Sequence, residues 1–147
     1  MSGHLLENLS FDMGYTFQAW ECSSGEYPQK MEDRLSDKAK HQVKGRLRYR
    51  ILPRTLCLLD YAYQSDQIER GHKTDPVTDK TSTYINRMDA HQVLDLAVEH
   101  TLLQDWVYFK DFKIKIFSNN ILDREYKEAR GYPMTERSFG CTLSCSF

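Results

Sequence analysis

The sequence contains no long apolar run. No segment approaches the roughly 20 consecutive apolar residues of a membrane-spanning helix, so that class of protein is excluded. The formal net charge is -1, with basic residues spread among acidic ones, and no nucleic-acid partner is expected. Hydrophobic residues make up 40% and charged residues 28%, an average that still permits a transmembrane β-barrel. A barrel strand gives only alternate residues to lipid, which hides its membrane signal.

Catalytic and metal-binding signatures are also missing. The four cysteines have no CxxC or zinc-type spacing, and the five histidines show no HExxH or comparable metal spacing. Cys141 and Cys145 lie about 13 Å apart on one extended strand, too far to form a disulfide. There is no Gly-rich phosphate loop and no nucleophile elbow. We therefore expect no cofactor, no metal and no enzymatic activity.

The strongest positive signal is the alternation in RSFGCTLSCSF, residues 137–147. Its apolar residues fall on every second position, and small polar residues occupy the positions between them. A strand places successive side chains on opposite faces, so this segment is predicted to be one strand with a continuous apolar face. The apolar members are Phe139, Cys141, Leu143, Cys145 and Phe147.

The same alternation predicts about six antiparallel strands and an all-β fold. The five further strands are expected at Leu9 to Trp20, Val43 to Ile51, Cys57 to Gln64, Val93 to Glu99 and Phe112 to Phe117. The polar stretch from Asp66 to Thr83, which contains Gly71 and Pro76, is predicted to be a loop.

The polar faces of these strands carry charges that suit a water-filled interior. Four cations on one face of a single strand would be hard to bury in a dry core, whereas a wet lumen accepts them. The candidate lumen-facing charges are Lys44, Arg46, Arg48, Arg50, Asp60, Asp95 and Glu99. A hydrolytic pair of carboxylates is the weaker interpretation; the acidic residues are expected to pair with Arg46, Arg48 and Lys113.

The predicted connections alternate in length. They are long at 21–42, tight at 52–55, long at 66–83, shorter at 101–111 and long at 120–136. Outer-membrane barrels combine short periplasmic turns with longer outer loops. The pattern therefore favours a portion of an antiparallel, up-and-down transmembrane β-barrel.

The C-terminal part of the chain resembles TonB-dependent outer-membrane receptors. Those receptors commonly carry an Asn-Leu-Phe-Asp-x-x-Tyr segment, a Gly-Tyr-Pro-x-x-Gly-Arg loop and a last strand that closes on Phe. The matching residues here are Asn120, Asp123, Tyr126, Gly131, Tyr132, Pro133, Arg137 and Phe147. Leu122, Glu136 and Cys145 depart from the usual residues. The similarity extends over nearly the whole chain and is strongest from Asp89 onward.

The resemblance implies that residues 1–147 form the last part of a barrel of about 22 strands. A complete receptor has a plug and a TonB-contacting box, and it imports iron-siderophore complexes, haem or cobalamin. Its last strand is the signal for the barrel assembly machinery, a role that would fall here to Phe139, Leu143 and Phe147. Implied partners are outer-membrane lipid, upstream strands and plug, that machinery, and TonB through the missing region.

We expect a fragment located in the bacterial outer membrane as part of a full-length receptor. The sequence shows no signal peptide and no plug-like segment, and about six strands are fewer than the eight of the smallest such barrels. Two alternatives stay open. One is a soluble β-barrel or sandwich that binds a small apolar ligand, and the other is a multimeric outer-membrane barrel with a structural or enzymatic role.

Overall fold

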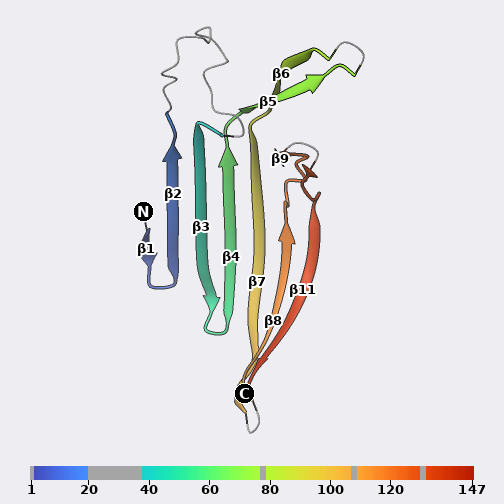
Figure 1. Cartoon of the computed structure of the whole chain (residues 1–147). Helices are drawn as coiled ribbons and strands as arrows, with labels where there is room; N and C mark the ends of the chain where they lie inside the picture. The colour runs from blue at the N-terminus through green and yellow to red at the C-terminus, as the bar shows by residue number, and fades with distance from the viewer. Residues whose placement is uncertain (1, 20–37, 77–78, 107–108, 130–131) are drawn as a thin grey trace.

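The computed structural model describes all residues except 1, 20–37, 77–78, 107–108 and 130–131. The fold is all-β, and its long strands form one antiparallel sheet in the order β1-β2-β3-β4-β7-β8-β11 (Figure 1). These strands are β1 (Ser2–Leu6), β2 (Leu9–Phe17), β3 (His41–Leu52), β4 (Thr55–Gln64), β7 (His91–Trp106), β8 (Phe109–Asn119) and β11 (Ser138–Ser146). Two short pairs complete the fold, β5 (Gln67–Thr74) with β6 (Thr81–Met88) and β9 (Lys127–Ala129) with β10 (Tyr132–Pro133).

The six predicted strands are confirmed as β2, β3, β4, β7, β8 and β11, although Trp20 lies outside the described residues. Three expectations were wrong. The stretch from Asp66 to Thr83 holds β5 and the start of β6, 120–136 holds β9 and β10, and 101–111 lies mostly within β7 and β8. The strand β1 was missed. The predicted β-sheet thus exists with one more strand, and two short strand pairs lie in its connections.

A bulge explains why β7 is longer than its alternation indicated. Thr101 lies opposite Lys113, but Leu103 already lies opposite Phe112, so Leu102 is an extra residue on β7. A bulge shifts the alternation by one position along the strand that contains it. The period-two signal therefore ends near the bulge, although pairing with β8 continues to Trp106.

The register gathers the alternating apolar residues that the sequence predicts to share a face of each strand on one face of the sheet. Residues directly opposite one another in neighbouring strands share a face. One such row crosses six strands through Leu9, Tyr49, Cys57, Val98, Ile116 and Cys141. The strands are also long, from 9 residues in β2 to 16 in β7. A transmembrane strand needs about 9–11 residues.

No second layer covers this apolar face in the described part of the chain. The exposed fractions of Phe139, Leu143 and Ile116 are 74%, 62% and 59%. Among the residues whose side chains the structure describes, the buried hydrophobic ones are Ala39, Ile68, Met88 and Ala97, and only Ala97 of these belongs to the long sheet. The described residues include no helix that is long and apolar enough to cross a membrane.

The connections follow the predicted alternation and lie at opposite ends of the sheet. The turns at 7–8 and 53–54, the last residue of β7 and the first residue of β8 lie at the end where the C-terminus lies (Figure 1). At the other end lie the end of β2, the start of β3, the β5–β6 hairpin between β4 and β7, and the turn that follows β8. We call this second end the loop end.

Phe117 and Gly140 fit together on the face opposite the apolar one. They are directly opposite on β8 and β11, and a Cβ added at Gly140 would overlap the Phe117 ring. An aromatic ring over a cross-strand glycine covers the backbone and helps to fix the pairing.

This fit predicts that Gly140→Val destabilises the sheet by about 1–3 kcal/mol, because the new side chain displaces the Phe117 ring. Gly14→Val is the matched control, since nothing lies within 4 Å of a Cβ added to Gly14. Urea unfolding of the chain refolded in detergent measures both effects. Equal midpoints for the two variants would contradict the fit.

Candidate functional site

The predicted lumen-facing charges share the face opposite the apolar one. Arg46 on β3 lies directly opposite Asp12 on β2 and Asp60 on β4. Its Nε donates to Oδ1 of Asp60 at 2.5 Å. Arg48 Nη1 lies 3.5 Å from Oδ2 of Asp12. The predicted association of acidic residues with Arg46 is confirmed by Asp60, whereas Arg48 pairs with Asp12, a residue that the sequence prediction had not named.

The charged row continues onto β7 and β8. Asp95 lies opposite Asp60, and Lys113 Nζ lies 3.9 Å from Oε1 of Glu99. Lys44 and Arg50 lie an even number of residues from Arg46 along β3, so they point to the same face. Their partners on β4 are Ala62 and Leu56. We call Asp12, Lys44, Arg46, Arg48, Arg50, Asp60, Asp95, Glu99 and Lys113 the charged face.

The charged face is open to solvent. The side chains of Arg46 and Asp60 are 51% and 41% exposed, which makes their ion pair a water-screened one. A shallow hollow of about 770 Å³ extends over this region from β2 to β7, with Asp12, Arg46 and Asp95 among its lining residues. Both signs of charge line the hollow, so it suits water or a polar protein surface. In the described part of the chain, no group of three or more His, Cys, Asp or Glu residues is placed to hold a metal ion.

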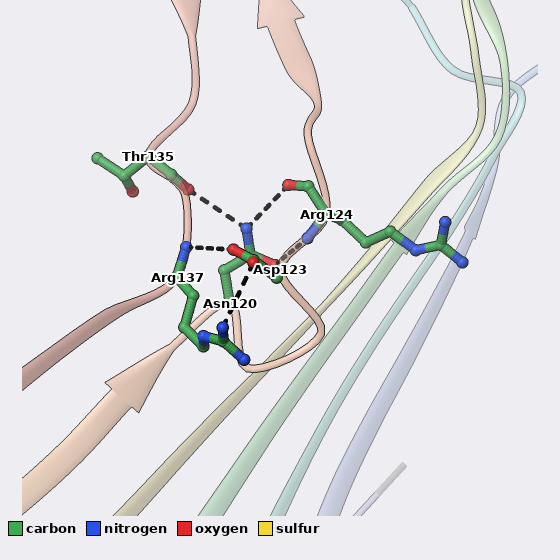
Figure 2. A network of polar contacts seen from close by, with 5 residues as sticks. All are labelled: Asn120, Asp123, Arg124, Thr135 and Arg137. Carbon is green, nitrogen blue, oxygen red and sulfur yellow. Dashed lines mark hydrogen bonds and ion pairs between the residues drawn. The ribbon is translucent and has the colours of Figure 1, made fainter.

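A second polar cluster joins the end of β8 to the start of β11. We call it the Asn120 lock, and it consists of Asn120, Asp123, Arg124, Thr135 and Arg137 (Figure 2). Asn120 Nδ2 donates to the backbone carbonyls of Arg124 at 2.9 Å and Thr135 at 3.3 Å, and Asn120 Oδ1 accepts from the Arg124 backbone N–H at 3.0 Å. Asn120 is only 2% exposed. A buried amide that makes three hydrogen bonds fixes the surrounding loop.

Asp123 supplies the other half of the Asn120 lock. Its Oδ1 accepts from the backbone N–H of Arg137 at 3.1 Å, and Oδ2 lies 3.5 Å from Nη2 of the same residue (Figure 2). Both Asn120 and Asp123 have positive φ, at 49° and 53°. Asn and Asp adopt this left-handed conformation more readily than other non-glycine residues. The motif residues therefore match both the turn geometry and the bonding.

The Asn120 lock is attached to β7 as well. The backbone N–H of Asn120 donates to Oδ1 of Asp95 at 2.8 Å, and that of Ile121 donates to the carbonyl of Leu94 at 2.8 Å. Asp95 thus links the charged face to the lock. The sequence prediction named both Asp95 and Asn120 but did not place them together, because only the strand register reveals that contact.

The remaining motif residues lie along the same segment. The Tyr126 ring stacks on His91, with ring centroids 4.6 Å apart, and its carbonyl accepts from the N–H of Met134 at 3.1 Å. Tyr132 and Pro133 form β10, paired with β9, whereas Gly131 lies outside the described residues. The contributions of Arg124 and Thr135 had no sequence signal, because both bind through backbone atoms.

The predicted assembly-signal residues belong to neither polar cluster, but the Arg137 guanidinium of the Asn120 lock lies over the Phe139 ring, 5.9 Å from the ring centroid. Phe139 and Leu143 belong to the apolar face, opposite Ser118 and Ile114 of β8. Phe147 follows the last residue of β11 and is 90% exposed. The arrangement offers a hydrophobic surface rather than a chemical centre.

The sequence matches no protein-family model, and a search of curated proteins returns no match.

The exposed Arg46–Asp60 pair predicts an electrostatic coupling that salt weakens, because the Debye length falls to about 3 Å at 1 M ionic strength. A double-mutant cycle with Arg46→Gln and Asp60→Asn should give a small favourable coupling in low salt and a smaller one in 1 M salt. Arg50→Gln combined with Asp60→Asn is the control, since Arg50 lies opposite Leu56 and not Asp60. A coupling unchanged by salt would show that the pair is shielded from water.

Proposed function

We propose that the chain is the C-terminal portion of a TonB-dependent outer-membrane receptor, in which the long sheet forms part of the wall of a transmembrane barrel. The observation that carries the proposal is the uncovered apolar face lying back to back with the charged face. The apolar side chains on one side of such a sheet are stabilised in hydrocarbon, and the charged side chains on the other side are stabilised in water. The wall of a water-containing barrel meets both requirements.

The size of the apolar face favours lipid as its environment. Burial of apolar surface contributes roughly 25 cal/mol per Å², so leaving this face in water forgoes much of the usual stabilisation. Soluble monomers rarely expose a contiguous apolar patch beyond a few hundred Å². Here exposed apolar side chains recur across the sheet, from Met13 and Tyr15 on β2 to Leu143 on β11. The soluble sandwich is less well supported, because its second layer is absent from the described residues.

Aromatic residues near the strand ends add support. Toward the loop end, the apolar face carries Phe17 at the end of β2, Tyr63 near the end of β4 and Phe139 near the start of β11. Toward the other end it carries Tyr49 and Phe112. Barrels carry aromatic girdles of this kind where the membrane meets water.

The proposal also assigns the two ends of the sheet. The loop end faces outward and the tight-turn end faces the periplasm, as in other outer-membrane barrels. The strands β1 and β11 are the edges of the described sheet, and their free backbone groups need partners within a bilayer. Those partners are the other strands of the receptor, whose plug and TonB contact complete the transporter for an iron-siderophore, haem or cobalamin-type ligand.

Spin labels on two neighbouring residues of β11 test the proposal. Native Cys145 lies on the apolar face opposite Phe112, and Ser144 lies on the other face opposite Lys113. The two single-cysteine chains are the one that retains only Cys145 and the one with Ser144→Cys and no other cysteine. In lipid vesicles, oxygen should relax the label at 145 strongly and a water-soluble nickel chelate should relax the label at 144.

The assay has two outcomes that contradict the proposal. One is strong relaxation of both labels by the nickel chelate, which would place both faces in water. The other is weak relaxation of the label at 145 by either reagent, which would indicate that protein covers the apolar face. A multimeric barrel would give the lipid pattern together with a cross-linkable, detergent-stable oligomer.

A further inference from the structure

The side chains of β11 do not by themselves fix its register on β8. The apolar residues Cys141, Leu143 and Cys145 repeat at every second position, and small residues occupy the other face. A one-residue slip would exchange the two faces and is strongly disfavoured, but a slip of two residues keeps every apolar residue on its own side. Something besides alternation has to select among registers that differ by two.

The Asn120 lock spans the two places that define this register. Asn120 directly follows Asn119, the last residue of β8, and Arg137 directly precedes Ser138, the first residue of β11. The Asn120 amide donates a hydrogen bond to the Thr135 carbonyl, and the Asp123 carboxylate accepts one from the Arg137 backbone N–H. A two-residue slip would move Arg137 by about 6.6 Å along the strand, which is incompatible with both hydrogen bonds.

The turn that contains the Asn120 lock is positioned by hydrogen bonds to β7, and these do not involve β11. Asp95 and Leu94 on β7 accept hydrogen bonds from the backbone of Asn120 and Ile121. The turn is therefore held in place independently of where β11 pairs. The Phe117 ring over Gly140 favours the same register, because a two-residue slip would place Ser138 or Thr142 opposite that ring.

We propose that the Asn120 lock sets the register of β11 on β8 and so presents the terminal strand in a single alignment. The register claim depends on these observed contacts, whereas its use in barrel assembly rests on the proposed function. Asn120 and Asp123 are positioning residues: they act on the backbone that enters β11 and leave the apolar face itself unchanged.

The native cysteines of β11 provide reporters of register. Ile116 lies opposite Cys141, so Ile116→Cys reports the observed register by disulfide formation. Ile114 lies opposite Leu143, between Cys141 and Cys145, so Ile114→Cys reports a slip of two residues in either direction. Directly opposite Cα atoms are about 4.5–5.5 Å apart, within disulfide range, whereas diagonal ones are about 7–8 Å apart and outside it. Cys22 and Cys57 are replaced by Ser in both reporters.

The test compares these reporters in the full chain with and without Asn120→Asp, which keeps the side-chain shape but removes both amide donors. Oxidation followed by peptide mass spectrometry identifies the disulfide partners. In the parent chain, the 116 reporter should cross-link to Cys141 and the 114 reporter should cross-link little. Asn120→Asp should raise slipped cross-links several-fold, whereas Leu122→Ala, a change at a 44% exposed residue of the same turn, should leave them at the parent level.

Unchanged cross-linking in Asn120→Asp would overturn the proposal. If that variant lacks β-structure by infrared spectroscopy, Asp123→Ser decides, since it removes the carboxylate contacts with Arg137 and leaves the Asn120 amide in place. If Asp123→Ser gives the same proportion of slipped cross-links as the parent chain, the proposal is overturned. A raised proportion of slipped cross-links would support it.

The assay is run in detergent and in lipid vesicles. A chain that stays out of vesicles but shows lock-dependent register contradicts only the proposed receptor function, whereas insertion with lock-independent register contradicts only the lock.

Discussion

The fold depends on the strict alternation of two kinds of side chain along strands that pair in one register. The row from Leu9 to Cys141 is apolar across six strands, while the opposite face of the sheet carries Asp12, Arg46 and Asp60. Because the described residues supply no second layer, hydrogen bonding between strands holds the sheet together and the surroundings must satisfy both faces. This requirement for two different solvents is the physical basis of the proposed membrane setting.

The two polar clusters have different tasks within this plan. The ion pairs of the charged face are exposed to water. Their desolvation penalty and their contribution to the free energy of unfolding are therefore both small. The Asn120 lock instead buries an amide and fixes a loop, and it has a defined geometry in consequence. Asp95 belongs to both, because it lies opposite Asp60 and also accepts from the backbone of Asn120.

The faces of the sheet were predicted well from the sequence, because a strand with one apolar face shows alternating apolar and polar residues along the chain. The prediction failed where that alternation is absent or broken. The β5 and β6 hairpin buries only a few apolar residues, among them Ile68 and Met88, and its polar composition indicated a loop. The bulge at Leu102 interrupted the alternation of β7. The motif residues Asn120 and Asp123 were found by resemblance, but their bonds to backbone atoms of Thr135 and Arg137 follow only from the folded loop.

Magnetic cross-relaxation in lipid nanodiscs tests the central claim most directly. With methyl labels on Ile, Leu and Thr, the account predicts that Ile114, Ile116 and Leu143 exchange magnetisation with lipid acyl-chain protons, while the Thr142 methyl group does so with water. Strong methyl contacts from these residues to a second protein layer, without any acyl-chain signal, would contradict it. That result would place the apolar face inside a protein core.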